Sequence, residues 1–434
     1  MRVATGSGAG DAAGVVFAAS PDSQGAQIVP DTAPDTHDQR LRVLVAGGGV
    51  AGLEALLALS DMAADRVDVT LLSPQEDFVY RPLAVAEPFS MGHVHRYPLA
   101  QLTKDLRARL VRATLERVDA EQRLVTTVDG EPLGFEALLV ATGGKAEVAI
   151  DHALTWWPEG DPDAFGGLLR DLEEAYVRKV AFVVPPQVAW PLPAYELALM
   201  TAREVKGMGI DDAQLTIVTP EDAPLGIFGR QAAEAVGAEL AAAGVEIITG
   251  AYVQRREAGH LELQPGARRL EVDSVVALPR AVGPRIDGLP ADDAGFIPTD
   301  EHGRVVGVDR VWAAGDGTNF PIKQGGLAAQ QADAAASSIA ALAGAGIAPE
   351  PFRPVLQGVL MTGEVPQFMS SDIAGGGEGQ AAASPLWWPP VKIAGRYLAP
   401  YLAARDPDLA IGAPGWRTRG SVEVEVEVEV EVGE

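Results

Sequence analysis

Three closely spaced glycines are the residues whose type and spacing point most directly to chemistry. Gly47, Gly49 and Gly52 follow the apolar run 41–46, and an amphipathic helical pattern occupies 51–62. Gly47 permits a tight turn, Gly49 lets backbone N–H groups approach a pyrophosphate, and Gly52 lets the helix pack close to the strand. A glycine turn without a ligand is the alternative, but the strand before it and the helix after it predict a bound dinucleotide.

The chain contains no cysteine, which rules out disulfides, thiolate metal sites and cysteine nucleophiles. Its six histidines are scattered, and the close pair His93 and His95 has no carboxylate at helical spacing, so we expect no metal site. No Gly-x-Ser-x-Gly motif joins a strand to a helix, which argues against a serine hydrolase. Any redox chemistry must therefore depend on a bound cofactor.

Two β-α-β units must position these residues. In the first, strands at 41–46 and 67–72 flank the helix at 51–62, as expected for neighbouring parallel strands. The second unit repeats this order with strands at 179–184, 215–219 and 245–249 and helices at 194–206 and 231–243. We also expect antiparallel strands within 109–128, a buried strand at 304–314 and a helix at 326–342. These elements predict the α/β class, with two Rossmann-like dinucleotide-binding domains.

Composition limits the partners and the location of the chain. A hydrophobic content of 47% is enough for sizeable cores, and the net charge of -26 argues against binding to nucleic acid, itself a polyanion. We find no signal-peptide pattern and no apolar stretch of about 18 residues, so we expect a cytoplasmic protein. Residues 1–39 lack periodicity and predict a flexible arm. The Val-Glu alternation of 421–434 predicts a solvated acidic tail, with an edge strand as the alternative.

Three separated motifs resemble those of flavoproteins with two dinucleotide-binding domains. They are the Gly47 turn, the stretch Phe-Glu-Ala-Leu-Leu-Val-Ala-Thr-Gly at 135–143, and Val-Trp-Ala-Ala-Gly-Asp at 311–316, which Lys-Gln-Gly-Gly-Leu-Ala follows at 323–328. Within that superfamily the chain resembles the branch of sulfide:quinone oxidoreductase, flavocytochrome c sulfide dehydrogenase and type II NADH dehydrogenase. Phe135 and Glu136 replace the Tyr-Asp pair of the branch. The resemblance implies noncovalently bound FAD.

The resemblance also implies how the chain is divided. We expect the FAD-binding domain to be split between 40–150 and 290–345. A second Rossmann-like domain, degenerate at its nucleotide turn, would be inserted at 151–289. A small C-terminal cap would follow at 346–420.

The third motif contains the residues that the resemblance places beside the flavin. Asp316 resembles the aspartate that accepts a hydrogen bond from the ribityl chain. Gln324, Gly325 and Gly326 open a helix whose N–H groups would face the flavin and stabilise negative charge on it. Lys323 would add positive charge there. An ordinary turn aspartate and an ordinary surface lysine are the alternatives.

Further cofactor contacts follow from the same resemblance. Gly315 would leave room for the cofactor, and Thr142 and Gly143 resemble the stretch that closes over the dinucleotide. Ser73 stands at the end of the second strand, where family members often have a carboxylate for the ribose. Arg81 lies in a loop that resembles the one at the flavin edge, and it would pair with the pyrophosphate or the isoalloxazine. A structural salt bridge is the alternative for Arg81.

The second β-α-β unit departs from the nucleotide-binding pattern. Counting back from Glu196 places Ala189, Pro191 and Ala194 at the glycine positions, and proline has no N–H to bind phosphate. We therefore expect this turn to fill its own space rather than bind NAD(P)H. The Pro-Ala-Tyr-Glu segment at 193–196 resembles the sulfide:quinone and flavocytochrome members. Glu196 is a candidate proton carrier beside the flavin, or else a structural residue at the helix start.

These features predict an FAD-dependent oxidoreductase that passes electrons from a small donor through noncovalent FAD to a quinone or similar acceptor. The relatives that oxidise sulfide use cysteines, which this chain lacks, so the donor stays open. One alternative is an NAD(P)H:acceptor oxidoreductase that admits the nucleotide at the degenerate turn in an unusual way. The other is a non-catalytic flavin-binding redox sensor or scaffold.

The segment 385–402 bears on the acceptor. It resembles the C-terminal region by which quinone-reducing relatives cap the flavin and meet the membrane. Trp387, Trp388, Tyr397 and Tyr401 lie close to cations in sequence, a composition that suits contact at the level of lipid headgroups. Such contact would place the protein at the inner face of the membrane. The alternative is a cap with the aromatic side chains packed inside.

Overall fold

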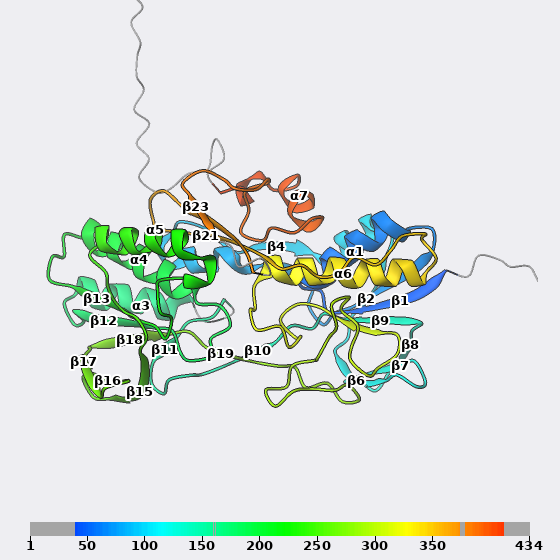
Figure 1. Cartoon of the computed structure of the whole chain (residues 1–434), viewed down its shortest axis with the longest axis horizontal. Coiled ribbons are helices and arrows are strands. Elements are labelled where there is room, and N and C mark those ends of the chain that lie inside the picture. The colour runs from blue at the N-terminus through cyan, green and yellow to red at the C-terminus, as the bar shows by residue number, and fades with distance from the viewer. Residues whose placement is uncertain (1–39, 159, 161, 374–377, 412–434) are drawn as a thin grey trace, which may run out of the picture. The chain divides into compact units, whose positions relative to one another are not determined.

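Two parallel five-stranded sheets form the framework of the chain. The structure, a computed structural model, describes residues 40–158, 160, 162–373 and 378–411, so the expected arm at 1–39 and tail at 421–434 lie outside the described residues. Figure 1 shows the sheet that contains β1, β2 and β9 toward one side and the sheet that contains β12, β13 and β18 toward the other. Among the described helices, none combines the length and hydropathy that crossing a membrane requires.

The first sheet has the strand order β20-β9-β1-β2-β5, with every pair parallel. Val43 and Val45 pack in the same cluster as residues of the helices α1 and α6, whereas Leu44 and Ala46 pack on the opposite face. Because both faces are covered, β9 and residues 43–46 of β1 are apolar throughout rather than alternating. The elements are β1 (Leu41–Ala46), α1 (Val50–Ala63), β2 (Val67–Leu72), β5 (Arg109–Val111), β9 (Ala137–Val140), β20 (Val311–Ala313) and α6 (Gly325–Leu342).

The second sheet repeats this arrangement in the order β11-β18-β12-β13-β14, again with parallel pairs. Val180 and Phe182 pack in the cluster that contains α4, and Ala181 and Val183 pack on the opposite face. The repeat confirms the predicted α/β class with two Rossmann-like units. Its elements are β11 (Leu154–Thr155), α3 (Pro162–Glu173), β12 (Lys179–Val183), α4 (Leu192–Gly207), β13 (Gln214–Val218), α5 (Arg230–Ala242), β14 (Glu246–Ile248) and β18 (Ser274–Ala277).

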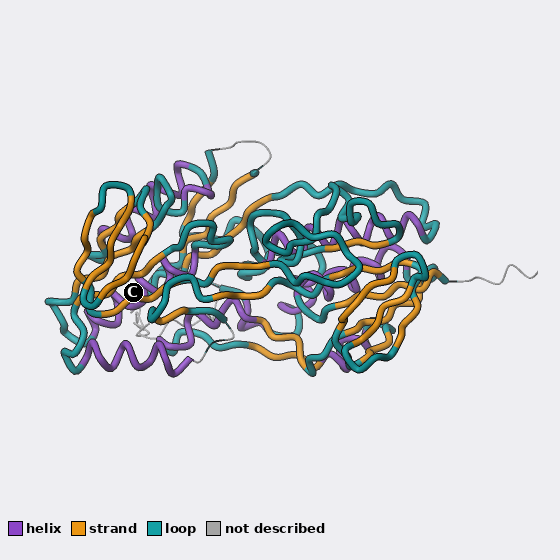
Figure 2. The backbone as a smooth tube through the Cα atoms, turned by 90° about the horizontal axis from the view of Figure 1, so that it is seen from below, coloured by secondary structure: helices purple, strands orange, loops and turns teal. Residues whose placement is uncertain are grey.

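An antiparallel three-stranded sheet occurs at the same point of each repeat. The strands β6 (Leu115–Asp119), β7 (Leu124–Thr127) and β8 (Pro132–Gly134) precede β9, and β15 (Tyr252–Glu257), β16 (His260–Gln264) and β17 (Arg268–Glu271) precede β18. The two connections between the parallel sheets, β10 (Lys145–Glu147) and β19 (Arg280–Val282), pair with each other antiparallel. Figure 2 shows groups of strands toward both ends, with long connections between them.

The C-terminal part packs on elements of both repeats. Its antiparallel strands are β21 (Val355–Leu360), β22 (Gln367–Asp372) and β23 (Gln380–Ala382), followed by α7 (Leu398–Ala403) and η3 (Pro407–Leu409). β21 contacts α6 and α4, β23 contacts α5, and α7 contacts α1. The remaining elements are β3 (Asp77–Tyr80), η1 (Arg81–Phe89), β4 (His95–Pro98), α2 (Leu99–Asp105) and η2 (Gly226–Phe228). The C-terminal part therefore contacts helices of both repeats.

Two expectations about strands are wrong. Arg109–Val111 joins the parallel sheet as β5, and antiparallel pairing within 109–128 begins only at Leu115. The strand expected at 304–314 is limited to Val311–Ala313, because the chain turns back and the Val305 N–H donates to the Val311 carbonyl at 2.9 Å. Gly307, with φ +79, lies in this turn. An apolar or alternating pattern indicates extended chain but does not identify its partner.

Candidate cofactor and active site

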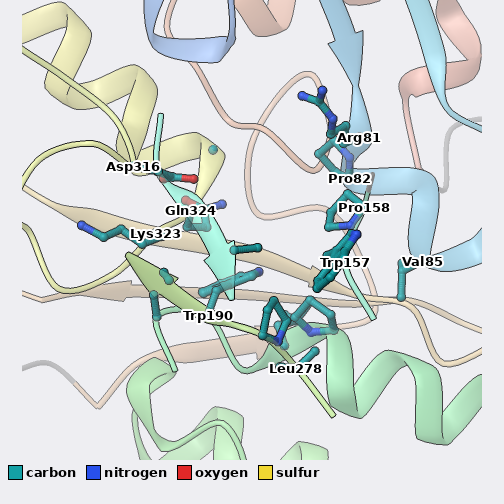
Figure 3. Close-up of a pocket in the computed structure, with 18 of the residues that line it drawn as sticks. Arg81, Pro82, Val85, Trp157, Pro158, Trp190, Leu278, Asp316, Lys323 and Gln324 are labelled. Atoms are coloured by element: carbon teal, nitrogen blue, oxygen red, sulfur yellow. The ribbon is translucent and has the colours of Figure 1, made fainter. Parts of the chain in front are cut away.

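A cavity of about 630 Å³ lies where the starts of α1, α4 and α6 come together. In Figure 3, Asp316, Lys323 and Gln324 lie on one side of this cavity, with Arg81 and Trp157 on the other. Its wall brings together many of the predicted site residues, which come from segments far apart in the sequence: Gly49, Arg81, Glu196, Asp316, Lys323, Gln324 and Gly325. We refer to it as the flavin-side cavity.

The glycine turn is shaped by close backbone contacts. Gly47 has φ +123, and a Cβ atom there would lie 2.1 Å from the Ala141 carbonyl oxygen. A Cβ at Gly52 would lie 1.9 Å from the Gly47 carbonyl oxygen. At Gly49, by contrast, a Cβ would meet nothing within 4 Å, and this residue borders the cavity. The first and third glycines therefore close the turn, and the second leaves open space toward the cavity.

The N-terminus of α1 is available to an anion. Gly49 is its N-cap, and no side chain caps the helix. The Leu53 N–H donates to the Gly49 carbonyl, so the N–H groups of the preceding turn have no partner in the helix ladder. These donors, together with the open space at Gly49, fit the pyrophosphate of a dinucleotide.

The start of α6 forms the opposite wall. Gln324 caps the helix, accepting from the Leu327 N–H at 2.9 Å and donating to the Gln357 carbonyl at 3.1 Å. A Cβ at Gly325 would lie 2.9 Å from the Ile393 side chain, so this position has no room for a larger residue. Gly315, with φ +83, donates its N–H to Gln331 at 2.7 Å. These bonds fix the turn that carries Asp316 onto the cavity wall.

Lys323 borders the cavity but its ammonium group bonds to its own loop. The Nζ atom donates to the carbonyls of Thr318 and Phe320 and lies 3.9 Å from the centroid of the Phe296 ring. Burial lowers the pKa of Lys323 to about 8, although the Asp316 carboxylate acts in the opposite direction. The positive charge expected beside the flavin is therefore lost as the pH rises through about 8, where Lys323 releases its proton.

A buried ion pair joins two distant segments in the cavity wall. Glu196 of α4 is 1% exposed and Lys392 is 8% exposed, and their Oε1 and Nζ atoms are 2.6 Å apart. Lys392 also donates to the Pro82 carbonyl at 3.2 Å, and Glu196 accepts from the Met361 N–H at 2.9 Å. Burial raises the pKa of Glu196, and the charge of Lys392 opposes the rise. The pair is therefore a buried set of two titratable groups in the cavity wall, and the role of Glu196 as a proton carrier stays a prediction.

The segment that carries Lys392 is anchored to the first repeat. The Tyr80 hydroxyl accepts from the Ile393 N–H at 3.1 Å. Glu54 of α1, fully buried, accepts from the N–H groups of Tyr397 and Leu398 at 2.7 and 2.8 Å. Residues of α1 and β3 thus place Lys392 and Ile393 against the cavity.

Glu54 lies close to a second carboxyl group, that of Asp333 on α6. Burial raises the pKa of Asp333 to about 8, and the charge of Glu54 adds to the rise. Because the folded-state pKa exceeds the ordinary value of 3.8, the folded protein retains a proton that the unfolded chain releases. The stability that this proton contributes is present in acid and is lost as the pH rises toward 8.

Asp333→Asn should remove that loss, because asparagine has no proton to release. We expect the unfolding free energy of the variant, relative to that of the wild type, to increase as the pH rises from 5 to 8. The increase should be at most about 1.4 kcal/mol per pH unit. Urea unfolding at pH 5, 7 and 9 measures this difference. Parallel pH profiles for the two proteins would show that Asp333 is ionised throughout.

Other residues expected to bind the cofactor lie around the turn rather than in the cavity wall. Ser73 is fully buried, next to Gly48, and its hydroxyl donates to Gln75 at 2.9 Å. Thr142 and Gly143 follow β9, and the Thr142 backbone nitrogen packs on Gly47. Gly326 is buried beside the Gln324 side chain. The Ser73 hydroxyl thus donates to a side chain of its own loop, and its contact with a ribose stays a prediction.

The four aromatic residues of the C-terminal segment have different surroundings. Trp387 packs edge-to-face on Phe368 at 5.4 Å and donates to the Val391 carbonyl at 3.1 Å. Tyr397 and Tyr401 are half-buried, with arginine side chains over their rings. Trp388 alone of the four is exposed, at 81%.

The sequence reasoning missed Lys392 and the tryptophans of the cavity wall. Lys392 is the single cation in an apolar run from 385 to 395, and that isolation is a signal of a buried, paired charge. Trp156, Trp157 and Trp190 also border the cavity. Nothing in their local sequence distinguishes them from core residues.

Comparison with known proteins agrees with this geometry. Residues 194–337 match the family model described as pyridine nucleotide-disulphide oxidoreductase. The chain is 28% identical over 201 residues to the sulfide-quinone reductase of Aquifex aeolicus, covering 43% of this chain and 44% of that protein. It is 26% identical over 296 residues to an NADH dehydrogenase-like protein of Mycobacterium tuberculosis, covering 63% and 72%. The matched stretch thus spans less than half of the sulfide-quinone reductase.

The fold comparison points the same way. The crystal structure of the sulfide:quinone oxidoreductase from Aquifex aeolicus superposes with a TM-score of 0.69 at 21% sequence identity, covering 76% of this chain and 84% of that one. The uncapped glycine turn, the repeated parallel sheets and the family match support one assignment. Residues 194–337 are similar to the pyridine nucleotide-disulphide oxidoreductase family, and the chain shares the fold of the sulfide:quinone oxidoreductase.

Proposed function

We propose that the chain is an oxidoreductase that takes electrons from a small donor and passes them, through noncovalent FAD, to a quinone. The observation that carries this proposal is the buried Glu196–Lys392 pair, which lies in the wall of the same cavity as Gly49, Asp316 and Gln324. Reduction of a quinone to a quinol consumes two protons with two electrons. A quinone in this cavity would lie beside the pair, which could supply protons for that reaction.

Specific residues of this chain would hold the cofactor. The N–H groups at Gly49 and the start of α1 would bind the pyrophosphate, with Gly47 and Gly52 closing the turn behind them. Asp316 and the N-terminus of α6 would bind the flavin end. Bound FAD supplies the two-electron redox chemistry.

The ion pair would supply protons at a defined atom. The Lys392 Nζ atom carries the proton that it donates to Glu196, and both groups border the cavity. A proton that passed from Lys392 to Glu196 would leave both groups neutral, and the burial that raises the pKa of Glu196 favours this form over a buried carboxylate. Release of a proton from the pair to the quinone would leave one negative charge in the pair, so a proton from solvent would have to replace it in each turnover.

An anaerobic donor screen tests this function. Purified, FAD-loaded protein is mixed with sulfide, NADH, NADPH or a quinol, and loss of the yellow absorbance identifies the donor. Steady-state reduction of a soluble quinone with that donor would support the proposal. Full FAD occupancy without turnover for any donor and quinone would contradict it and favour a flavin-binding redox sensor.

A lipid-soluble quinone requires contact with the membrane surface, which we propose that Trp388 makes. Trp388→Ser should leave the unfolding free energy within about 0.5 kcal/mol of the wild type, because the side chain is 81% exposed. It should lower several-fold the fraction that floats with zwitterionic, ubiquinone-containing vesicles. Tyr176→Ser, which changes an aromatic residue that is 75% exposed in the second repeat, is the matched control. Wild-type protein that stays at the bottom of the gradient would disprove the contact.

A further inference from the structure

The turn between β12 and α4 has a cavity on each side. The flavin-side cavity, of about 630 Å³, is bordered by Val188, Ala189 and Trp190. A second cavity, of about 810 Å³, is bordered by Val188, Ala189 and Pro191 and reaches Glu221 beyond the end of β13. We call it the outer groove. The turn thus lies between two open volumes, and the expectation that it fills its own space rather than binding NAD(P)H stays a prediction.

The turn cannot bind a pyrophosphate that would bridge these volumes. Pro191 is the N-cap of α4 and Pro193 follows in its first turn, so neither offers an N–H. The Ala194 N–H donates to the Pro191 carbonyl at 3.1 Å, and the Val188 N–H donates to the Pro185 carbonyl at 3.2 Å. The start of α4 therefore offers fewer backbone N–H donors than the start of α1, because two of its positions are proline and the Ala194 N–H is already bonded.

Contacts from two sides hold the turn in place. The Ala189 carbonyl accepts from the Lys323 N–H at 3.1 Å, which ties the turn to the loop before α6. The Trp190 ring packs edge-to-face on Phe228 at 5.8 Å, and Figure 3 shows it at the cavity beside Leu278. Movement of Trp190 out of the path would break the contact with Phe228.

We propose that Trp190 and Pro191 divide a dinucleotide-sized site into two. The flavin-side cavity then admits an electron donor of mononucleotide size or smaller and excludes NAD(P)H. A dinucleotide that placed its nicotinamide in the flavin-side cavity would need its pyrophosphate over this turn and its adenosine in the outer groove. The bulk of Trp190 and the missing N–H of Pro191 oppose that path. This inference rests on the proposed function, because it takes the flavin-side cavity to be the place where the donor reacts.

Calorimetric binding to the oxidised, FAD-loaded protein tests the barrier without turnover. The probes are NAD⁺ and nicotinamide mononucleotide, which lacks the adenosine half. In the wild type we expect NAD⁺ to bind no more tightly than the mononucleotide, because the adenosine half cannot reach the outer groove. Binding of NAD⁺ at least tenfold tighter than the mononucleotide in the wild type would overturn the inference.

The double variant Trp190→Gly/Pro191→Gly removes the bulk and restores an N–H. We expect its affinity for NAD⁺ to rise at least tenfold, with less than a threefold change for the mononucleotide. Trp190→Phe, which retains a ring at the turn, should behave as the wild type. An FAD-loaded double variant without this rise in NAD⁺ affinity would overturn the inference. If the double variant fails to bind FAD, Trp190→Ala replaces it, with the same expected rise in NAD⁺ affinity. Failure of the proposed function would appear as absence of donor–quinone turnover in the wild type. That rate is measured separately from these binding affinities, so the two failures can be told apart.

Discussion

Gly49→Ala protein is expected to fold normally and to bind FAD about 10–100-fold more weakly, a loss of about 1.4–2.8 kcal/mol. A Cβ at this position meets no protein atom within 4 Å, and the residue has extended backbone angles that alanine adopts freely. The added methyl group would instead enter the space that the pyrophosphate needs. Flavin fluorescence titration of the refolded apoprotein measures the change in affinity.

Gly52→Ala is the matched substitution, and it should act on the fold itself. The new Cβ would lie 1.9 Å from the Gly47 carbonyl oxygen, a backbone atom that cannot move without opening the turn. We expect the unfolding free energy of the apoprotein to fall by about 3 kcal/mol, the upper end for overpacking. Urea unfolding of both apoproteins separates the two effects. Equal destabilisation by the two variants would contradict the assigned roles of the glycines.

Lys392→Met is the second change with a large expected effect. It leaves the Glu196 carboxyl buried without its partner, and removing one member of a buried pair costs about 3–5 kcal/mol if the other stays charged. Quinone reduction should fall by at least about 100-fold, as expected when a general acid is removed. The measurements are urea unfolding and the steady-state rate with a soluble quinone.

The pH dependence of this variant has a definite sign. Without Lys392, only the hydrogen bond from the Met361 N–H opposes the burial that raises the pKa of Glu196 above its ordinary value of 4.5. The folded variant then holds a proton that the unfolded chain has released. Its unfolding free energy should therefore fall as the pH rises above about 4.5, by at most about 1.4 kcal/mol per pH unit. A profile parallel to that of the wild type would show that Glu196 stays ionised.

The double variant Glu196→Gln/Lys392→Met separates stability from proton supply. It buries two neutral side chains in place of the pair, so most of the lost stability and the extra pH dependence should be recovered. Quinone reduction should remain as slow as in the single variant, because no exchangeable proton is left in the pair. Recovery of both properties together would mean that the pair has only a structural role.

The sequence predicted the parts of the site that depend on local backbone geometry. Gly47, Gly49 and Gly52 act within one turn, and their spacing alone specifies a tight bend, an open approach and a close helix contact. The apolar strand before that turn and the helix after it predicted that the turn lies at the carboxyl end of a strand in a parallel sheet. The strand at 304–314 was harder, because the turn at Gly307 depends on pairing between Val305 and Val311 rather than on apolar content.

What the sequence by itself determined is the cofactor turn, the α/β class with two similar units, and the absence of cysteine chemistry, because each depends on residue types at short spacing. Only the tertiary structure decided that Glu196 meets Lys392, 196 residues away, and that Trp190 stands between two cavities. The order of strands in both sheets and the packing of the C-terminal part on both repeats bring these residues together. Such contacts depend on the path of the whole chain, which no local pattern records.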